Sequence, residues 1–312
     1  ALLCAVLAAL LVGSIGGCGG GVGTEGTGTF SSVGSGPITG FGSIVVSGVR
    51  YDDSSATVRD DDGNGRDRSQ LALGMVVDVE GGAVATGADG VTLSATATSV
   101  RTRRALLGPA ASVNAATGSL QVLGQQVLVT ADTTFGSSLS GGLAAVANGQ
   151  LLEVWGLYDA SRTAWVATRI DTATAGSTYC VSGPVASVDG AQSFTLGSQR
   201  FAGSTSGLAA GSIVQLKLQA GTDDSGRWVV STQRADAPPS GEFDGAGVEG
   251  VVTALQSAGR FTVNGTTVDS SAARVDGTVA AGAWVQVRGS LKAGVLVATR
   301  VQASTPEQVR GF

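Results

Sequence analysis

Residues 74–81 read GMVVDVEG, and three similar octapeptides follow along the chain. They read GQLLEVWG at 149–156, GSIVQLKL at 211–218 and GAWVQVRG at 282–289. Counted from the first Gly, the third and fifth residues after it are aliphatic in every copy, while the fourth is Asp, Glu, Gln and Gln in turn. This alternation of apolar and polar residues predicts a β-strand with one buried face.

Each of these strands belongs to a longer unit that is repeated four times. The units open at Gly36, Gly108, Gly183 and Gly250, and Pro follows the first three of these glycines. A hairpin centred on a second Gly comes next, at Gly48, Gly124, Gly197 and Gly265. The pair Asn264-Gly265 is the strongest of these signals, because both central residues of a type I′ turn need positive φ. Each unit then closes on a further strand, such as ATRI at 167–170.

The units predict an all-β fold. Each contains about five short strands separated by turn signals, and no segment has helical periodicity. Five short strands with one apolar face are best accommodated in a small barrel, which leaves no exposed strand edge. We expect four tandem five-stranded barrels, OB-like or SH3-like. They span residues 36–104, 105–176, 177–237 and 244–305, with a linker at 238–243 and a tail at 306–312.

The repeated motifs resemble a known bacterial family. GPVASV at 183–188, FTVNGTTV at 261–268 and VATRI at 166–170, with the octapeptides, are similar to domain of unknown function 5666. The resemblance covers residues 36 to about 303 and implies tandem repeats in a secreted protein or lipoprotein, with no established activity. The third unit departs from the pattern, because Leu218 stands where the closing Gly is expected and Arg234 replaces the final aliphatic residue. Closure of its barrel is therefore the least secure.

Composition excludes several classes of function. The chain has 312 residues, 49 of them Gly, a net charge of -5 and no His. The absence of His excludes Ser-His-Asp triads, Cys-His pairs and imidazole-ligated zinc. An acidic chain has the wrong sign to bind the phosphate backbone of nucleic acid. No nucleophile is accompanied by a base, so we expect no enzyme, no catalytic residue and no cofactor.

The N-terminal residues predict an export signal. Ala1 to Val12 is an unbroken apolar run, too short to span a bilayer but long enough for the core of a signal peptide. Ile15-Gly16-Gly17-Cys18 then resembles the bacterial lipobox, in which the cysteine is acylated. We therefore expect residues 1–17 to be a truncated signal peptide and Cys18 to be the lipid-attachment site. Gly19 after that cysteine favours anchoring in the outer membrane of the cell envelope, with the protein on the periplasmic face or on the surface face.

A flexible tether is expected to follow Cys18. The remainder of the segment 18–35 is rich in Gly, Ser and Thr, and the 17 residues after Cys18 would span about 23 Å as a flexible coil. Cys180 would then be the one free thiol of the mature chain, and its apolar neighbours predict a buried side chain without reactivity.

Two charged stretches qualify as solvated surface. Residues 60–65 read DDDGNG, and Asp60, Asp62 and Asn64 match the first half of a calcium loop. Loop position 12 is Leu71 rather than the required Glu, so we expect a long solvated hairpin loop, with a weak Ca²⁺ site as the alternative. Arg101, Arg103 and Arg104 form the second stretch, which we interpret as a solvated connection between repeats rather than a lipid or partner site.

The aromatic residues leave two hypotheses for function. The strand alternation points Trp155 away from its own barrel, where it either packs against an adjacent repeat or serves as a platform for a sugar ring. Trp284 occupies an aliphatic position and is expected to pack. The first hypothesis is a non-enzymatic, membrane-anchored envelope lipoprotein that acts as a structural or interaction module with a protein partner. The alternative is a module that binds envelope polysaccharide through Trp155, and a weak Ca²⁺-binding domain or a hydrolase comes third.

Overall fold

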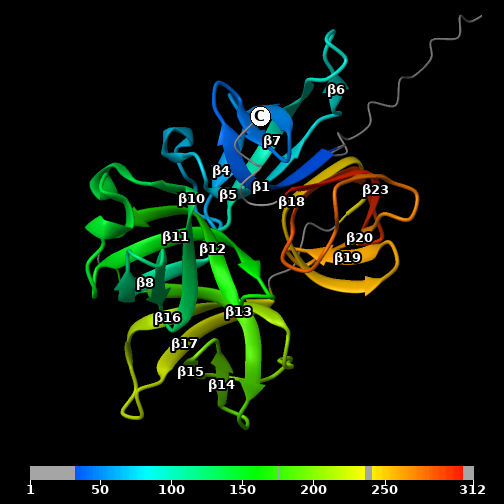
Figure 1. The fold of residues 1–312 in the computed structure, drawn as a ribbon. Helices are drawn as coiled ribbons and strands as arrows, with labels where there is room; N and C mark the ends of the chain where they lie inside the picture. The colour runs from blue at the N-terminus through cyan, green and yellow to red at the C-terminus, as the bar shows by residue number, and fades with distance from the viewer. Residues whose placement is uncertain (1–31, 175, 177, 236–240, 305–312) are drawn as a thin grey trace, which may run out of the picture.

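The computed structural model describes residues 32–174, 176, 178–235 and 241–304, which form β-strands and short 3-10 turns (Figure 1). No α-helix occurs among these residues. The predicted all-β class is therefore confirmed.

The first barrel shows how each repeat closes. It consists of β1 (Ser32–Gly40), β2 (Ile44–Val46), β3 (Val49–Asp52), β5 (Val76–Gly81) and β7 (Leu93–Thr102). The strands pair in the ring β1-β2-β3-β7-β5-β1, and β3 runs parallel to β7. Two short strands, β4 (Thr57–Arg59) and β6 (Ala85–Thr86), pair with β7, and the turn η1 (Arg68–Gln70) precedes β5.

The same ring recurs in the later repeats. The second barrel contains β8 (Leu106–Asn114), β9 (Ser119–Val122), β10 (Gln125–Phe135), β11 (Leu151–Asp159) and β12 (Ala164–Thr172), with turns η2 (Ser137–Leu139) and η3 (Gly142–Ala145). The third contains β13 (Thr178–Val188), β14 (Ser193–Leu196), β15 (Gln199–Ala202), β16 (Ile213–Thr222) and β17 (Trp228–Ala235). The fourth contains β18 (Phe243–Ser257), β19 (Arg260–Val263), β20 (Thr266–Asp269), β22 (Trp284–Lys292) and β23 (Val295–Ser304), with β21 (Arg274–Asp276) added beside β23.

The strand order decides between the two barrel types that the sequence left open. In each ring the first strand pairs with the second and the fourth, and the third lies parallel to the fifth. This is the Greek-key order of the OB-fold, and the SH3-like alternative is excluded. The third barrel also closes, although its parallel contact is short, with two register pairs between β15 and β17.

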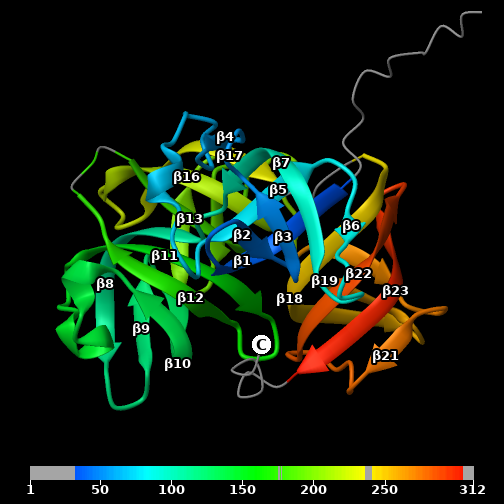
Figure 2. The ribbon, with the colours of Figure 1, turned by 90° about the horizontal axis from the view of Figure 1, so that it is seen from above.

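The strands of the four barrels form two continuous sheets, and the barrels that share a sheet are not always neighbours in the chain. Barrels 1 and 4 share a 13-stranded sheet through parallel pairing of β1 with β18, and barrels 2 and 3 share a 10-stranded sheet through β8 and β13. Figure 2 shows the first and last barrels side by side, in blue and in orange to red. The described part of the chain is therefore a block in which barrels distant in sequence are joined.

Two predicted boundaries are wrong. Ser32 to Ser35 were expected in the tether, but they pair with Gly245 to Val248 on one side and with β5 on the other. Phe243, expected in the linker, begins β18 and is buried. In both places the barrel 1–barrel 4 sheet provides backbone partners that extend the strands beyond the repeat motif.

The predicted hairpins are present. The turns between the second and third strands lie at 47–48, 123–124, 197–198 and 264–265. Asn264 and Gly265 both have positive φ, of 48° and 82°, as a type I′ turn requires.

Candidate functional site

The fourth strands show the alternation that the sequence predicts. The two aliphatic positions of each octapeptide point inward, and all are buried: Val77, Val79, Leu152, Val154, Val214, Leu216, Val285 and Val287. Of the polar side chains between them, Asp78 is 7% exposed and Glu153 is 19% exposed, so these two outward positions are largely removed from water. The centre where the barrels meet is lined by residues of β5, β11, β16 and β18, and we call it the junction. Two of its lining residues, Arg103 and Arg104, are charged.

Arg104 lies between three barrels and pairs with two acidic side chains. Its guanidinium is 3.3 Å from Asp61 Oδ2 and also contacts the carboxylate of Glu153. Asp61 belongs to the loop after β4 of barrel 1 and Glu153 to β11 of barrel 2, while Gln215 of barrel 3 donates to Asp61 at 3.5 Å. Arg104 and its partners therefore connect parts of three barrels. Both carboxylates are largely removed from water, so each needs the Arg104 cation to compensate its charge.

Burial and charge act in opposite directions on this cluster. Burial raises the pKa of Asp61, and Arg104 offsets part of that rise. Burial alone would lower the pKa of Arg104, but the Asp61 and Glu153 carboxylates reverse this and raise it. Cys180 Sγ lies 3.8 Å from Asp61 Oδ2, and burial raises the pKa of the thiol to about 12. The Cys180 side chain is buried, as predicted, and its raised pKa keeps the thiol protonated. A protonated thiol is a poor nucleophile, because the thiolate is the reactive form.

The interpretation of Arg101, Arg103 and Arg104 as a solvated connection is wrong for two of the three side chains. The side chain of Arg101 is 49% exposed, but those of Arg103 and Arg104 are only 17% and 16% exposed. Arg101 and Arg103 pair with Asp78 of β5 at 2.8 Å and 3.5 Å. The connection does join barrels 1 and 2, but acidic partners make desolvation of its arginines possible.

The Asp-rich loop is exposed over residues 62–65, but one of its side chains, Asp61, contacts a distant barrel. Its backbone forms a hairpin bridged between Arg59 and Gly65, but Asp61 is buried against barrel 3. Asp62 pairs with Lys217 of β16 at 2.7 Å, and Arg234 of β17 donates to the Asp61 carbonyl. The expected solvated hairpin is therefore confirmed for residues 62–65, which are exposed, but not for Asp61, which is buried where cations of barrel 3 meet the loop.

The weak metal candidates have protein partners of their own. Asp60 Oδ1 accepts hydrogen bonds from the backbone N–H groups of Asp62 and Asn64, and Asp60 Oδ2 accepts one from the Asn64 side chain. Asp62 is held by Lys217. Within the described ranges, no group of three or more Cys, Asp or Glu side chains could hold a metal ion. These carboxylates shape the loop and dock it.

A second buried acid, Glu249, lies on β18 where barrels 1 and 4 meet. Trp284 Nε1 and Gln286 Nε2 donate to its two carboxylate oxygens at 3.3 Å and 3.2 Å. Arg288, two residues further along β22, donates to the carbonyls of Ser47 and Gly48 in barrel 1 instead. Burial raises the pKa of Glu249, and these hydrogen bonds offset only part of the rise.

Glu249→Gln is expected to stabilise the protein at alkaline pH. A pKa raised on folding means that the protonated side chain favours the folded state below its unfolded pKa, and that this contribution is lost as the pH rises through the folded pKa. Urea unfolding should show the stability of the variant, relative to the native chain, rising between pH 5 and pH 8, because only the native side chain must lose a buried proton. An equal difference at both pH values would contradict the assignment.

Trp155 points away from its own barrel and is buried in a cluster formed mainly by barrel 1. Its side chain is 0% exposed and belongs to the same apolar cluster as Tyr51, Met75 and Val251. The hypothesis of Trp155 as an exposed ligand platform is therefore wrong, and the alternative, packing against an adjacent repeat, is confirmed. A ring of this size buries a large apolar area when a neighbouring barrel covers it. Trp284 packs against the same cluster, as predicted.

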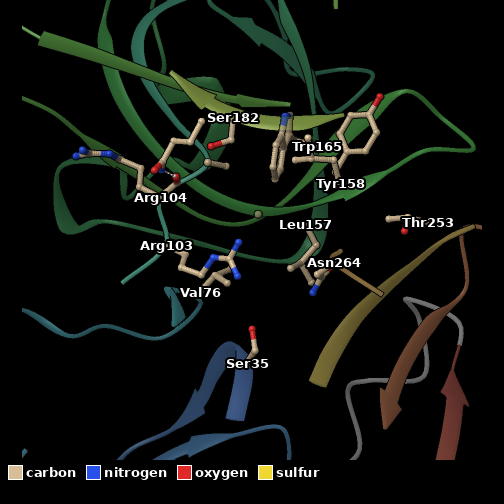
Figure 3. Close-up of a pocket in the computed structure, with 14 residues that line it drawn as sticks. Ser35, Val76, Arg103, Arg104, Leu157, Tyr158, Trp165, Ser182, Thr253 and Asn264 are labelled. Atoms are coloured by element: carbon tan, nitrogen blue, oxygen red, sulfur yellow. Dashed lines mark hydrogen bonds between the residues drawn. The ribbon is translucent and has the colours of Figure 1, made fainter. Parts of the chain in front are cut away.

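A small cavity of about 50 Å³ lies in the junction (Figure 3). Arg103 from the β7–β8 connection, Leu157 from β11 and Asn264 from the β19–β20 turn point toward one another across it. Trp165 lines its other side, next to Tyr158, and their rings meet edge to face at 5.5 Å. A cavity of this size holds a few water molecules and is far below the several hundred Å³ of a typical ligand pocket.

The family relationship agrees with this repeated architecture. A family model described as domain of unknown function, DUF5666, matches residues 28–96, 108–171 and 249–302, which is more than half of the chain. The chain belongs to the DUF5666 family. The three matches fall on the first, second and fourth barrels, and the third barrel, whose motif departs from the pattern, is not matched. No curated protein matches the chain.

The Gly that opens each of the four octapeptides has the same backbone conformation but different neighbours in the four barrels. Gly74, Gly149, Gly211 and Gly282 all have φ between 80° and 85°. A Cβ on Gly74 would lie 2.3 Å from the Thr168 carbonyl oxygen of barrel 2, and one on Gly282 would lie 2.5 Å from Ser161 Oγ. A Cβ on Gly149 or Gly211 would meet nothing within 4 Å. Two of the four positions therefore belong to contacts between barrels.

Gly74→Ala should consequently destabilise the protein more than Gly149→Ala. Both substitutions place a Cβ at positive φ, which costs about 1–2 kcal/mol. Gly74→Ala must also separate Gly74 from barrel 2, where Thr168 Oγ1 donates to the Gly74 carbonyl at 2.6 Å. A total of about 3 kcal/mol or more is expected for Gly74→Ala by urea unfolding. Equal losses for the two variants would show that this contact contributes nothing.

The sequence did not identify three residues at contacts between barrels as interacting: Asp61, Arg104 and Glu249. Glu249 carries one signal, a polar residue beside an aliphatic residue in a predicted strand, whereas Asp61 lies in a loop and Arg104 in a connection, where strand alternation gives none. Cys18 and the tether up to residue 31 lie outside the described residues. None of the described residues forms a helix that could cross a bilayer.

Proposed function

We propose that this DUF5666 chain is a non-enzymatic structural or interaction module of the bacterial envelope, anchored by acyl chains on Cys18. Residues 15–18 read IGGC, which combines the aliphatic and small residues that precede an acylated cysteine. Two or three acyl chains, at about 0.8 kcal/mol for each buried CH₂, hold a protein on a membrane almost permanently.

Charged contacts between the barrels support the structural part of this proposal. Asp61, Asp62, Glu153, Arg104 and Lys217 are all engaged in contacts between barrels. We infer that the Arg104 pairs favour one arrangement of the barrels that they join, because another arrangement would leave the Asp61 and Glu153 carboxylates without a cation. A block that holds its barrels in one arrangement suits a protein that presents a fixed surface to a partner.

The chemistry of the described side chains also fits a non-enzymatic role. Cys180 is buried with its pKa raised to about 12, and Lys217 is paired with Asp62. Trp155 has no exposed ring to offer a polysaccharide. The proposal therefore favours a protein partner over a glycan.

Metabolic labelling with palmitate tests the anchor. The native chain should incorporate label and partition with outer membranes after cell fractionation. Cys18→Ser should abolish both, while Cys180→Ser, the matched control, should retain both. Label that persists in Cys18→Ser, or a native chain recovered in the soluble fraction, would overturn the proposal.

A further inference from the structure

The connection between the fourth and fifth strands is longest in barrel 1. It covers residues 82–92, which include β6, whereas the other barrels use 160–163, 223–227 and 293–294. We call residues 82–92 the β6 hairpin. Figure 1 shows it projecting beyond the barrels, and its contacts do not contribute to any apolar cluster beyond Val84 at its base.

The tip of the β6 hairpin presents an apolar side chain on a well-formed turn. Val91 is 79% exposed, the highest value among the large apolar side chains described. The Gly87 N–H donates to the Thr92 carbonyl at 2.7 Å, and Asp89 Oδ1 accepts from the backbone of Val91 and Thr92 at 2.9 Å each. The turn therefore holds Val91 outward before any partner arrives, which lowers the entropic cost of a contact.

The base of the β6 hairpin adjoins the first described residue. Ser32 pairs with Gly81, and its hydroxyl donates to the Gly82 carbonyl at 2.7 Å. From Gly82 to Gly87 the hairpin can advance at most about 17 Å, the length that five residues reach at the rise of a β-strand. Thirteen residues separate Cys18 from Ser32, and a tether of that length can span about 20 Å. The tip and the membrane are thus at similar distances from Ser32.

We propose that the tip of the β6 hairpin, with Val91 and Ala88, contacts the lipid surface in which Cys18 is anchored and so sets the orientation of the block. This inference rests on the proposed function. A single Val contributes little alone, but the anchor supplies a high effective concentration of membrane at the tip. Asp89 is the one charged residue of the hairpin, and its hydrogen bonds lower its pKa to about 2. A carboxylate at the tip favours zwitterionic over anionic lipid.

Site-specific fluorescence on the acylated full-length chain tests this contact. A Val91→Cys variant can be labelled selectively with an environment-sensitive fluorophore, because Cys18 is acylated and Cys180 is buried. The labelled chain is reconstituted into phosphatidylcholine vesicles that carry a quencher on the acyl chain. Ala116→Cys, on the exposed β8–β9 turn of barrel 2, is the matched control.

The expected result is a blue-shifted emission that is quenched at position 91 and unchanged at position 116. Replacing part of the phosphatidylcholine with an anionic lipid should reduce the shift at position 91. A chain that floats with the vesicles but gives the same emission at both positions would overturn the contact and leave the anchor intact. A chain that does not float with the vesicles would overturn the anchor, and the contact with it.

Discussion

Trp155→Ala is expected to lower the free energy of unfolding by about 3–5 kcal/mol, as large-to-small substitutions of buried aromatic residues do. Trp155 is the largest of the fully buried side chains in the described ranges. Its ring shares an apolar cluster with Met75 of barrel 1 and Val251 of barrel 4, so its removal leaves a cavity where three barrels meet. Urea unfolding followed by circular dichroism measures the loss.

Two further variants test why Trp155→Ala is destabilising. Trp155→Phe tests the size of the ring, and Trp228→Ala tests whether the position of the Trp matters. Trp155 Nε1 has no hydrogen-bond partner among the described residues, so Trp155→Phe loses only volume and should cost about 1–2 kcal/mol. Trp228→Ala is the control, because Trp228 is only partly buried, beside Tyr179. A loss below 1 kcal/mol for Trp155→Ala would mean that the barrels do not depend on this contact.

Arg104→Met should be comparably damaging, for an electrostatic reason. Removing one partner of a buried ion pair costs about 3–5 kcal/mol, because a charge remains buried without compensation. Arg104→Met leaves two such groups, Asp61 and Glu153. Methionine keeps much of the side-chain length, so the loss of charge dominates the effect.

Arg101→Met is the matched control for Arg104→Met. Both arginines belong to the same connection, but Arg101 is half exposed and its pair with Asp78 is screened by water. We expect at most about 1 kcal/mol for Arg101→Met. Adding Asp61→Asn and Glu153→Gln to Arg104→Met should restore part of the lost stability. Equal effects of the two single variants, or no recovery in the triple variant, would contradict the role given to the Arg104 cluster.

Much of the architecture follows from local patterns in the sequence. The two aliphatic positions of each octapeptide are buried, and Asn264-Gly265 forms its predicted turn. These predictions succeed because side-chain alternation and turn geometry depend on residues a few positions apart. The choice between OB-like and SH3-like barrels is different, because it depends on which distant strands pair.

The errors have a common physical origin. Alternation shows that Trp155 and Glu153 point away from their barrel, but it does not show whether water or protein lies there. The same applies to Asp61 of the Asp-rich loop, which is buried only because barrel 3 is folded beside barrel 1. Ser32 to Ser35 resemble a flexible tether until β18 provides a strand for them to pair with.

The sequence by itself determined the all-β class, the repeated unit and the inward face of each fourth strand, because these depend on the spacing of neighbouring residues. It also shows why the chain contains so many glycines, since the repeats use Gly at corresponding turns. Only the tertiary structure decided that barrel 1 joins barrel 4, and that Arg104, Asp61 and Glu153 meet in the junction. Contacts between barrels join residues far apart in the chain, and their energy depends on burial that exists only after the barrels have packed together.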